Sequence, residues 1–297
     1  MPALNEIERK IGESSKQIAQ VIDATRLEAL SKLSAFTGRN TIAYYSCWLL
    51  RGVPGHDIND LDIDGFMNVI HGMDRKKGLD LILHTPGGGI AATEQIVHYL
   101  RSIFGADIRC IVPQLAMSAG TMIACSSKEI IMGRQSCLGP IDPQFYNLPC
   151  HGVVEEFESA KKEVADNPAY LGVWQPIIGK YNPTFVGECK KAMALSENLV
   201  KQWLSSGMFV GEKDRAARAR KAVKALSDHA ATKTHNRHLP AEAIKKIGLK
   251  VSMMEDNDQF QDLILTVHHT FMLTLIKSKI VKIMESDVGK MFVINGQ

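Results

Sequence analysis

Hydrophobic residues between positions 41 and 133 occur in short, nearly continuous runs that alternate with segments of helical spacing. Such runs are typical of strands buried on both faces of a sheet, and they predict strands at 41–50, 79–84, 107–113 and 129–133. The segments between them predict helices at 62–75, from the turn after residue 84 to about Phe104, and from Ser118 onward. Strands that alternate with helices form parallel sheets with right-handed crossovers, so we expect an α/β fold with a helix-wound parallel sheet.

Both ends of the chain are predicted to be mainly helical. Residues 3–35 predict a helix that packs either between subunits or on its own domain, with an apolar stripe at Leu4, Ile7, Ile11, Ile18 and Val21. The second half predicts a helix from near Pro183 to Gly207, a basic helix over 212–229, and a short helix that stops at Gly248 before a strand. The chain is then helical and finally extended. We therefore expect a helical arm over residues 1–40 and one domain over residues 41–297.

Composition limits the function classes only coarsely. A chain of 297 residues with 45% hydrophobic and 23% charged residues can bury a sizeable core and is unlike a disordered chain. Its net charge of +3 argues against extensive nucleic-acid binding. The six cysteines are scattered and include no CxxC pair, which favours a reducing, cytoplasmic location over a disulfide framework.

No targeting or membrane-spanning segment is expected. The first sixteen residues are charged throughout and lack the apolar core of a signal peptide. The most apolar late stretch, 263–276, contains two histidines and is shorter than the roughly 20 residues that a membrane span requires. A buried helix is the expectation there, and peripheral association with a membrane stays open.

The sequence HTPGGG, residues 84–89, follows a predicted buried strand and opens a helix. Its glycines, Gly87, Gly88 and Gly89, allow the backbone to approach a ligand closely and to direct amide N–H groups into a cavity. A tight structural turn is the alternative. A phosphate loop is disfavoured, because neither the P-loop pattern nor the GxGxxG pattern is present.

Ser118, in the sequence AMSAGT, occupies the same position one strand–helix unit later. In an open parallel sheet these turns cluster at the carboxyl ends of the strands, where ligands bind. The glycine amides and the Ala119 amide are therefore expected to converge beside the Ser118 hydroxyl, as in an oxyanion hole beside a nucleophile. The alternative is that Ser118 only caps the helix.

A serine nucleophile requires a general base, and composition does not identify it. Asp142 lies in the turn-rich sequence LGPIDPQ, and His235 lies in THNRHL before the last short helix. The competing candidates are His151, His229, His238 and Lys180.

These motifs resemble those of the serine dehydrogenase proteinase (SDH) family, which belongs to the Clp/crotonase-like superfamily with signal peptide peptidase A and the Clp protease proteolytic subunit. The resemblance rests on PGGG, AMSAGT and LGPIDPQ in this order; it is dense over about 60–145 and resumes over 228–252. It implies a Clp/crotonase-like fold and a serine endopeptidase that acts on peptides or proteins without a cofactor or a metal.

The resemblance also implies roles for individual residues. Ser118 matches the family nucleophile, and the Ala119 amide belongs to the matching oxyanion hole. Gly88 matches the oxyanion turn, with Gly87 or Gly89 as its neighbour.

Asp142 and His235 match the remaining members of a proposed triad, although histidine precedes aspartate in the Clp protease. A lysine replaces this pair in the signal peptide peptidases, and Lys180 is its best stand-in here. Asn236, Arg237 and His238 stand where acidic and aromatic residues are usual in the family, so His238 stays a competitor of His235.

Three functions are compatible with these motifs. The first is a serine peptidase that forms an acyl-enzyme, which the retained Ser118 favours. The second is a scaffold in which the cavity binds a ligand or partner without turnover. The third, an acyl-CoA hydratase or isomerase, would use the same oxyanion geometry, but a serine at the helix tip argues against it. A homo-oligomer is expected because of the N-terminal stripe, the late apolar helices and the ring- or trimer-forming relatives; the substrate and the oligomer size stay open.

Overall fold

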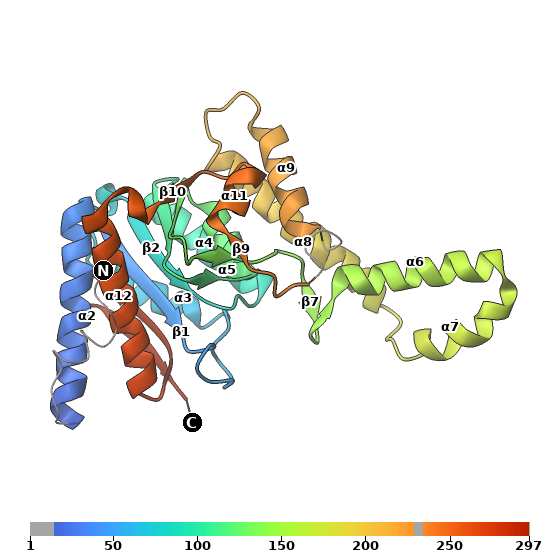
Figure 1. The fold of residues 1–297 in the computed structure, drawn as a ribbon, viewed down its shortest axis with the longest axis horizontal. Helices are drawn as coiled ribbons and strands as arrows, with labels where there is room; N and C mark the ends of the chain where they lie inside the picture. The colour runs from blue at the N-terminus through green and yellow to red at the C-terminus, as the bar shows by residue number, and fades with distance from the viewer. Residues whose placement is uncertain (1–14, 229–233, 297) are drawn as a thin grey trace.

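The computed structural model describes residues 15–228 and 234–296. Within these residues, the centre is a seven-stranded sheet with the order β10-β5-β3-β2-β1-β11-β12 (Figure 1). Its strands are β1 (Asn40–Ser46), β2 (Leu79–His84), β3 (Ile108–Val112), β5 (Glu129–Met132), β10 (Val251–Met253), β11 (Ile280–Ser286) and β12 (Met291–Asn295). Neighbours from β10 to β1 are parallel, and β11 and β12 extend the sheet in antiparallel pairing. The predicted α/β fold with a helix-wound parallel sheet is confirmed.

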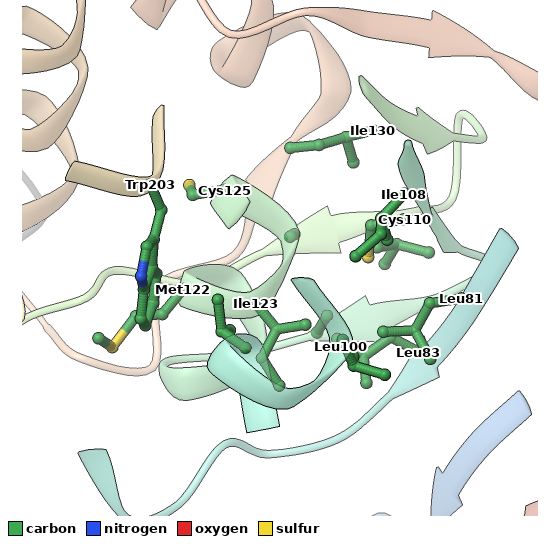
Figure 2. Packing of buried hydrophobic residues seen from close by; sticks show 14 of the residues in the cluster. Leu81, Leu83, Leu100, Ile108, Cys110, Met122, Ile123, Cys125, Ile130 and Trp203 are labelled. Carbon is green, nitrogen blue, oxygen red and sulfur yellow. The ribbon is translucent and has the colours of Figure 1, made fainter. Parts of the chain in front are cut away.

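Helices cover both faces of the sheet. One face carries α2 (Ser15–Thr37) and α12 (Asp258–Lys277), which bury Leu30, Leu33 and Phe271 against it. The opposite face carries α3 (Asp62–Ile70), α4 (Ile90–Phe104), α5 (Ala119–Ser126), α8 (Phe185–Ser206), α9 (Arg215–Ser227) and α11 (Ala241–Ile247). In Figure 2, Met122 and Ile123 of α5 lie between Leu81 of β2 and Trp203 of α8. The helix that begins beside Ser118 is therefore held on both sides by the core.

Some element boundaries differ from those predicted. The helix predicted over 62–75 is α3, which ends at Ile70, because Gly72 then takes a φ of 89° that a helix does not allow; a 3-10 turn, Arg75–Lys77, follows. The strand predicted over 41–50 ends at Ser46, after which the Cys47 amide donates to the Val281 carbonyl. The helix predicted from Pro183 to Gly207 is α8.

A helical hairpin that the hydrophobic pattern did not locate projects from the body of the molecule (Figure 1). It consists of α6 (Cys150–Asp166), a 3-10 turn (Pro168–Tyr170) and α7 (Leu171–Ile178). No residue of α7 is buried, although the helix is largely apolar, and its Leu171 and Val173 are each 55% exposed. The hairpin thus presents an apolar surface far from the sheet.

The described part of the predicted N-terminal helix is α2, which lies along α12 (Figure 1). Its inward residues Ile22, Ala29 and Leu33 are buried within the same chain. Leu4, Ile7 and Ile11 of the predicted stripe lie outside the described residues, as does the side chain of Ile18. The division into an arm over 1–40 and a domain over 41–297 stays a prediction.

The apolar stretch 263–276 lies in α12, as expected for a buried helix. Ile264, Val267 and Leu275 are fully buried beneath the sheet. Among the described residues, no helix is both long enough and apolar enough to cross a membrane.

Candidate active site

Ser118 lies between β4 (Leu115–Ala116) and α5, in a backbone conformation that is rare for serine. Its φ is 49° and its ψ is −114°, and its hydroxyl makes no capping hydrogen bond to α5. Sparsely populated backbone conformations of this kind cost about 1–3 kcal/mol and persist only where the surrounding fold enforces them. Ser118 is half-buried, whereas its neighbours Met117 and Ala119 are buried. The side chain is therefore turned outward from the core rather than used to cap a helix.

The glycine turn packs against Ser118. Gly87 and Gly88 have positive φ values of 101° and 156°. A methyl group on Gly87 would lie 2.7 Å from the Ser118 Cβ and 2.8 Å from the Ala119 nitrogen, so only glycine allows this approach. The turn and the first residues of α5 consequently share one small space, as the strand–helix alternation predicted.

The hydrogen bonds of the turn distinguish its amides. The Gly87 amide donates to the Thr85 hydroxyl at 3.2 Å, and the Gly89 amide donates to the Ile58 carbonyl at 2.8 Å. Within the described residues, no group accepts a hydrogen bond from the amide of Gly88 or of Ala119. These two donors are therefore available to a ligand, whereas those of Gly87 and Gly89 are already engaged.

Asp142 follows a segment that is tied to the helices around Ser118. The Thr121 hydroxyl of α5 donates to the Gly139 carbonyl and accepts from the Gly139 amide, each at 2.9 Å. The Ile141 amide donates to the Leu226 carbonyl at 3.1 Å, and the Ile141 carbonyl accepts from Ser196 of α8 at 2.9 Å. The Asp142 side chain that follows is completely buried.

His235 lies against this carboxylate. Its Nδ1 is 2.9 Å from Asp142 Oδ1, and its side chain is 15% exposed. A carboxylate that accepts from Nδ1 fixes the imidazole tautomer and leaves Nε2 to accept a proton. The structure therefore brings together the aspartate and the histidine that lie 93 positions apart in the chain.

A small sheet with the order β4-β6-β9 gathers the three candidate segments. Its strands are Leu115–Ala116, Cys137–Leu138 and Leu239–Pro240. Ser118 follows β4, Asp142 follows β6, and His235 precedes β9. β4 is also joined to the start of the glycine turn, because the Thr85 amide donates to the Leu115 carbonyl at 3.2 Å, and the Met117 amide donates to the Thr85 carbonyl at 3.0 Å. Strands of two residues have no hydrophobic pattern that would reveal them in the sequence.

Ser118 and His235 line the same cavity, which has a volume of about 670 Å³. The glycine turn and Ala119 form part of its wall, and Met122, Ile141, Phe145 and Leu195 add apolar surface. Sequence reasoning did not include His56 and Asp57 from the loop after β1, or Glu188 and Lys191 from α8, all of which also line it. Their spacing in the chain gives no motif that could have identified them.

The other candidate bases are located elsewhere. Lys180 lines a separate cavity of about 330 Å³ together with Tyr181 and Phe185, and it is not among the residues that line the Ser118 cavity. His238 is exposed, and His151 lies in the first turn of α6; neither lines the Ser118 cavity. His229 lies outside the described residues.

Two further titratable groups near the site are unsuited to its chemistry. Burial raises the pKa of the Cys150 thiol to about 12, with smaller effects from Cys189 and Asp142, so Cys150 stays protonated and is a poor nucleophile. Burial lowers the pKa of His84 to about 4, so this histidine, which directly precedes the glycine turn, stays neutral. Its Nε2 lies 3.1 Å from Gln114 Oε1, and it does not line the cavity.

Comparison with known proteins adds two findings. The model of a family described as ClpP-like SDH-type serine proteinase matches residues 24–273. Two curated proteins of Methanocaldococcus jannaschii are also similar. "Uncharacterized protein MJ0137" is 30% identical over 203 residues, which is 68% of this chain and 63% of that protein. "Uncharacterized protein MJ1495" is 31% identical over 174 residues, which is 59% of this chain and 52% of that protein. The chain thus spans less than two thirds of the length of either relative.

Proposed function

Because the chain belongs to the ClpP-like SDH-type serine proteinase family, we propose that it is a serine peptidase with Ser118 as nucleophile, His235 as general base and Asp142 as the residue that orients His235. The amides of Gly88 and Ala119 form the oxyanion hole in this proposal. Gly87 and Gly89 shape the turn, because their amides already donate to Thr85 and Ile58.

The acylation step follows from these positions. Ser118 Oγ attacks the carbonyl carbon of the scissile peptide bond while His235 Nε2 takes the hydroxyl proton. The carbonyl oxygen becomes an oxyanion and accepts from the Gly88 and Ala119 amides, with additional stabilisation from the amino-terminal end of α5. The C–N bond then breaks, and His235 returns the proton to the departing amine.

Deacylation repeats the sequence with water. His235 Nε2 takes a proton from a water molecule, which attacks the acyl carbon and forms a second oxyanion in the same hole. The C–O bond to Ser118 breaks, the serine recovers its proton from His235, and the new carboxyl group leaves. In both steps the buried Asp142 carboxylate stabilises the imidazolium through the bond to Nδ1.

The observation that carries the proposal is the 2.9 Å contact between His235 Nδ1 and Asp142 Oδ1, beside a cavity that Ser118 also lines. A serine at a helix start is common, and so is a glycine turn, but a buried carboxylate bonded to a histidine that lines the same cavity as the serine supports His235 as the base in this proposal. The position of Lys180 in a different cavity argues against the lysine alternative.

The test is covalent labelling with a fluorophosphonate probe followed by peptide mapping. We expect the label on Ser118, no label in Ser118→Ala, and unchanged labelling in Ser205→Ala, a matched control whose hydroxyl donates to the Lys201 carbonyl of its own helix. His235→Ala is expected to lose labelling and peptide hydrolysis, whereas Lys180→Ala retains both. A folded protein that takes no label would refute the peptidase and favour the non-catalytic, ligand-binding alternative.

Self-association belongs to the same proposal. The described part of the N-terminal helix buries Ile22, Ala29 and Leu33 within its own chain. The support comes instead from α7, in which no residue is buried and Leu171 and Val173 are each 55% exposed. A helix of this kind is stabilised when a second copy buries it. The cytoplasmic location and the substrate class stay predictions from the sequence.

A further inference from the structure

Lys282 of β11 and Asp62 of α3 form an ion pair whose two side chains are completely buried. Lys282 Nζ donates to Asp62 Oδ1 at 2.7 Å and to the Asp57 carbonyl at 2.6 Å. Asp62 Oδ2 accepts from the Tyr44 hydroxyl at 2.8 Å and from the Asn59 amide at 3.1 Å. The pair therefore holds the backbone of the loop after β1 on both sides of Ile58.

This arrangement is weak evidence for stability alone. Removing two charges from water carries a large desolvation cost, and well-packed apolar side chains of the same volume often stabilise a fold as well or better. The Lys282 ammonium, however, reaches both the Asp62 carboxylate and the Asp57 carbonyl, which an apolar side chain could not bind. What the pair provides is a fixed position for the loop.

Ile58 connects this loop to the glycine turn through two backbone hydrogen bonds. Its amide donates to the Gly87 carbonyl at 2.7 Å, and its carbonyl accepts from the Gly89 amide at 2.8 Å. The peptide bond between Gly87 and Gly88 is trans and planar, so its C=O and N–H point in opposite directions. Because Ile58 binds the Gly87 carbonyl, the Gly88 N–H is directed away from Ile58.

We propose that Lys282 and Asp62 are a positioning pair for the oxyanion hole: they fix the loop at residues 57–59, and Ile58 in turn fixes the direction of the Gly88 N–H. This inference rests on the proposed function, because it assigns a role within the same site. Neither side chain lines the cavity, so the pair acts only through the loop.

The loop and the glycine turn are in close contact. A methyl group on Gly88 would lie 2.2 Å from the Ile58 carbonyl oxygen and 2.4 Å from its nitrogen. Ile58 therefore lies directly against Gly88, and its hydrogen bonds to Gly87 and Gly89 couple its position to that of the Gly88 amide. A misplacement of about 1 Å at a reacting centre reduces turnover on the order of 10²-fold.

The test removes both charges at once, because a single change would leave an unpaired buried charge that endangers folding. In Lys282→Met with Asp62→Asn, the amide oxygen can still accept from Tyr44 and Asn59. The variant loses the ion pair, the bond to the Asp57 carbonyl and the contact of the ammonium with the Tyr44 ring. The matched control is Arg26→Met with Glu285→Gln. Arg26 and Glu285 form another buried ion pair that also uses β11, but Arg26 comes from α2 and the pair lies away from the glycine turn.

We expect the Lys282/Asp62 variant to lose kcat on the order of 10²-fold while KM stays within about threefold, since the donor acts mainly on the transition state. Its affinity for a peptide aldehyde, which forms a tetrahedral oxyanion on the serine, should fall by the same factor as kcat/KM. Hydrogen exchange at the Ile58 and Gly89 amides should accelerate. The control pair should leave all three quantities near wild type.

Wild-type kcat and wild-type exchange in the folded Lys282/Asp62 variant would overturn the inference, as would an equal loss in the control pair. A wild-type protein that neither cleaves peptides nor takes label at Ser118 would instead refute the proposed function. Hydrogen exchange needs no activity, so in that case it still decides whether the pair holds the loop.

Discussion

Replacing Gly88 by alanine tests the oxyanion hole most directly, because Gly89→Ala is a matched control in the same turn. We predict that Gly88→Ala removes most of the peptidase activity and that Gly89→Ala does not. The two substitutions add the same methyl group to adjacent residues. The group on Gly88 would overlap Ile58, whereas the group on Gly89 would lie at ordinary contact distances.

The magnitude follows from the distances. The added Gly88 methyl group would lie 2.2 Å from the Ile58 carbonyl oxygen, so the atoms must separate by about 1 Å to reach an ordinary contact. Such a displacement costs on the order of 10²-fold in rate, and loss of one oxyanion donor costs about 10²–10³-fold, or about 2.7–4 kcal/mol. The φ of 156° adds strain of about 1–3 kcal/mol to the folded state.

The same methyl group fits at Gly89 without a steric clash. Its φ is −65°, and an added methyl group would lie 3.7 Å from the Ile58 carbonyl oxygen and 3.8 Å from the Ala92 Cβ. Its amide already donates to Ile58. Gly89→Ala should therefore change the free energy of unfolding by less than about 1 kcal/mol and leave activity near wild type.

The assay is kcat/KM on one peptide substrate, with urea unfolding of each variant to show that it is folded. We expect a loss of about 10²–10³-fold for Gly88→Ala. A folded Gly88→Ala variant within tenfold of wild type would refute the assignment of this amide. So would a Gly89→Ala variant with an equal loss, because the free and the engaged amide would then be indistinguishable.

Three further predictions concern other parts of the molecule. Asp142→Asn should lower kcat on the order of 10⁴-fold, because the amide favours the wrong tautomer of His235, while thermal unfolding stays close to that of the wild type. Burial lowers the pKa of His84 from 6.5 to about 4, so the unfolded chain takes up a proton that the folded chain does not as the pH falls through this range. This should reduce the free energy of unfolding by up to about 3 kcal/mol, and urea unfolding of His84→Gln should show a weaker pH dependence. Leu171→Asp should shift sedimentation towards smaller species at micromolar concentration, whereas Val210→Asp, at a residue that is also 55% exposed, should not.

Regular secondary structure was predictable where long hydrophobic patterns encode it. The run at 79–84 is β2 at both ends, because a strand buried on both faces contains few polar residues to obscure its limits. The helix predicted over 62–75 ended early because the pattern continues to Met73, whereas Gly72 leaves the helical conformation. Hydrophobic spacing therefore located the elements better than it located their ends.

The details of the candidate site depend on contacts that no local pattern encodes. The sequence suggested three glycine amides, but only the fold shows that two of them are already hydrogen-bonded. The partner that engages Gly89 is Ile58, in a loop whose sequence, GVPGHDIND, predicts only a turn-rich connection. Equally, nothing in the residues near Lys180 indicates that it lines a separate cavity.

The pairing of Asp142 with His235 has a simple basis in the small sheet. β6 and β9 are antiparallel, and Leu138 pairs with Leu239. From this pair the two segments run along each other, and each reaches its candidate residue after four positions, Asp142 on one side and His235 on the other. Strand register, rather than order along the chain, brings an acid and an imidazole together, so a histidine that follows the aspartate in sequence can still meet it. In this register His238 lies one position from the paired Leu239, where it is exposed and does not line the Ser118 cavity, while His235 is in contact with the carboxylate.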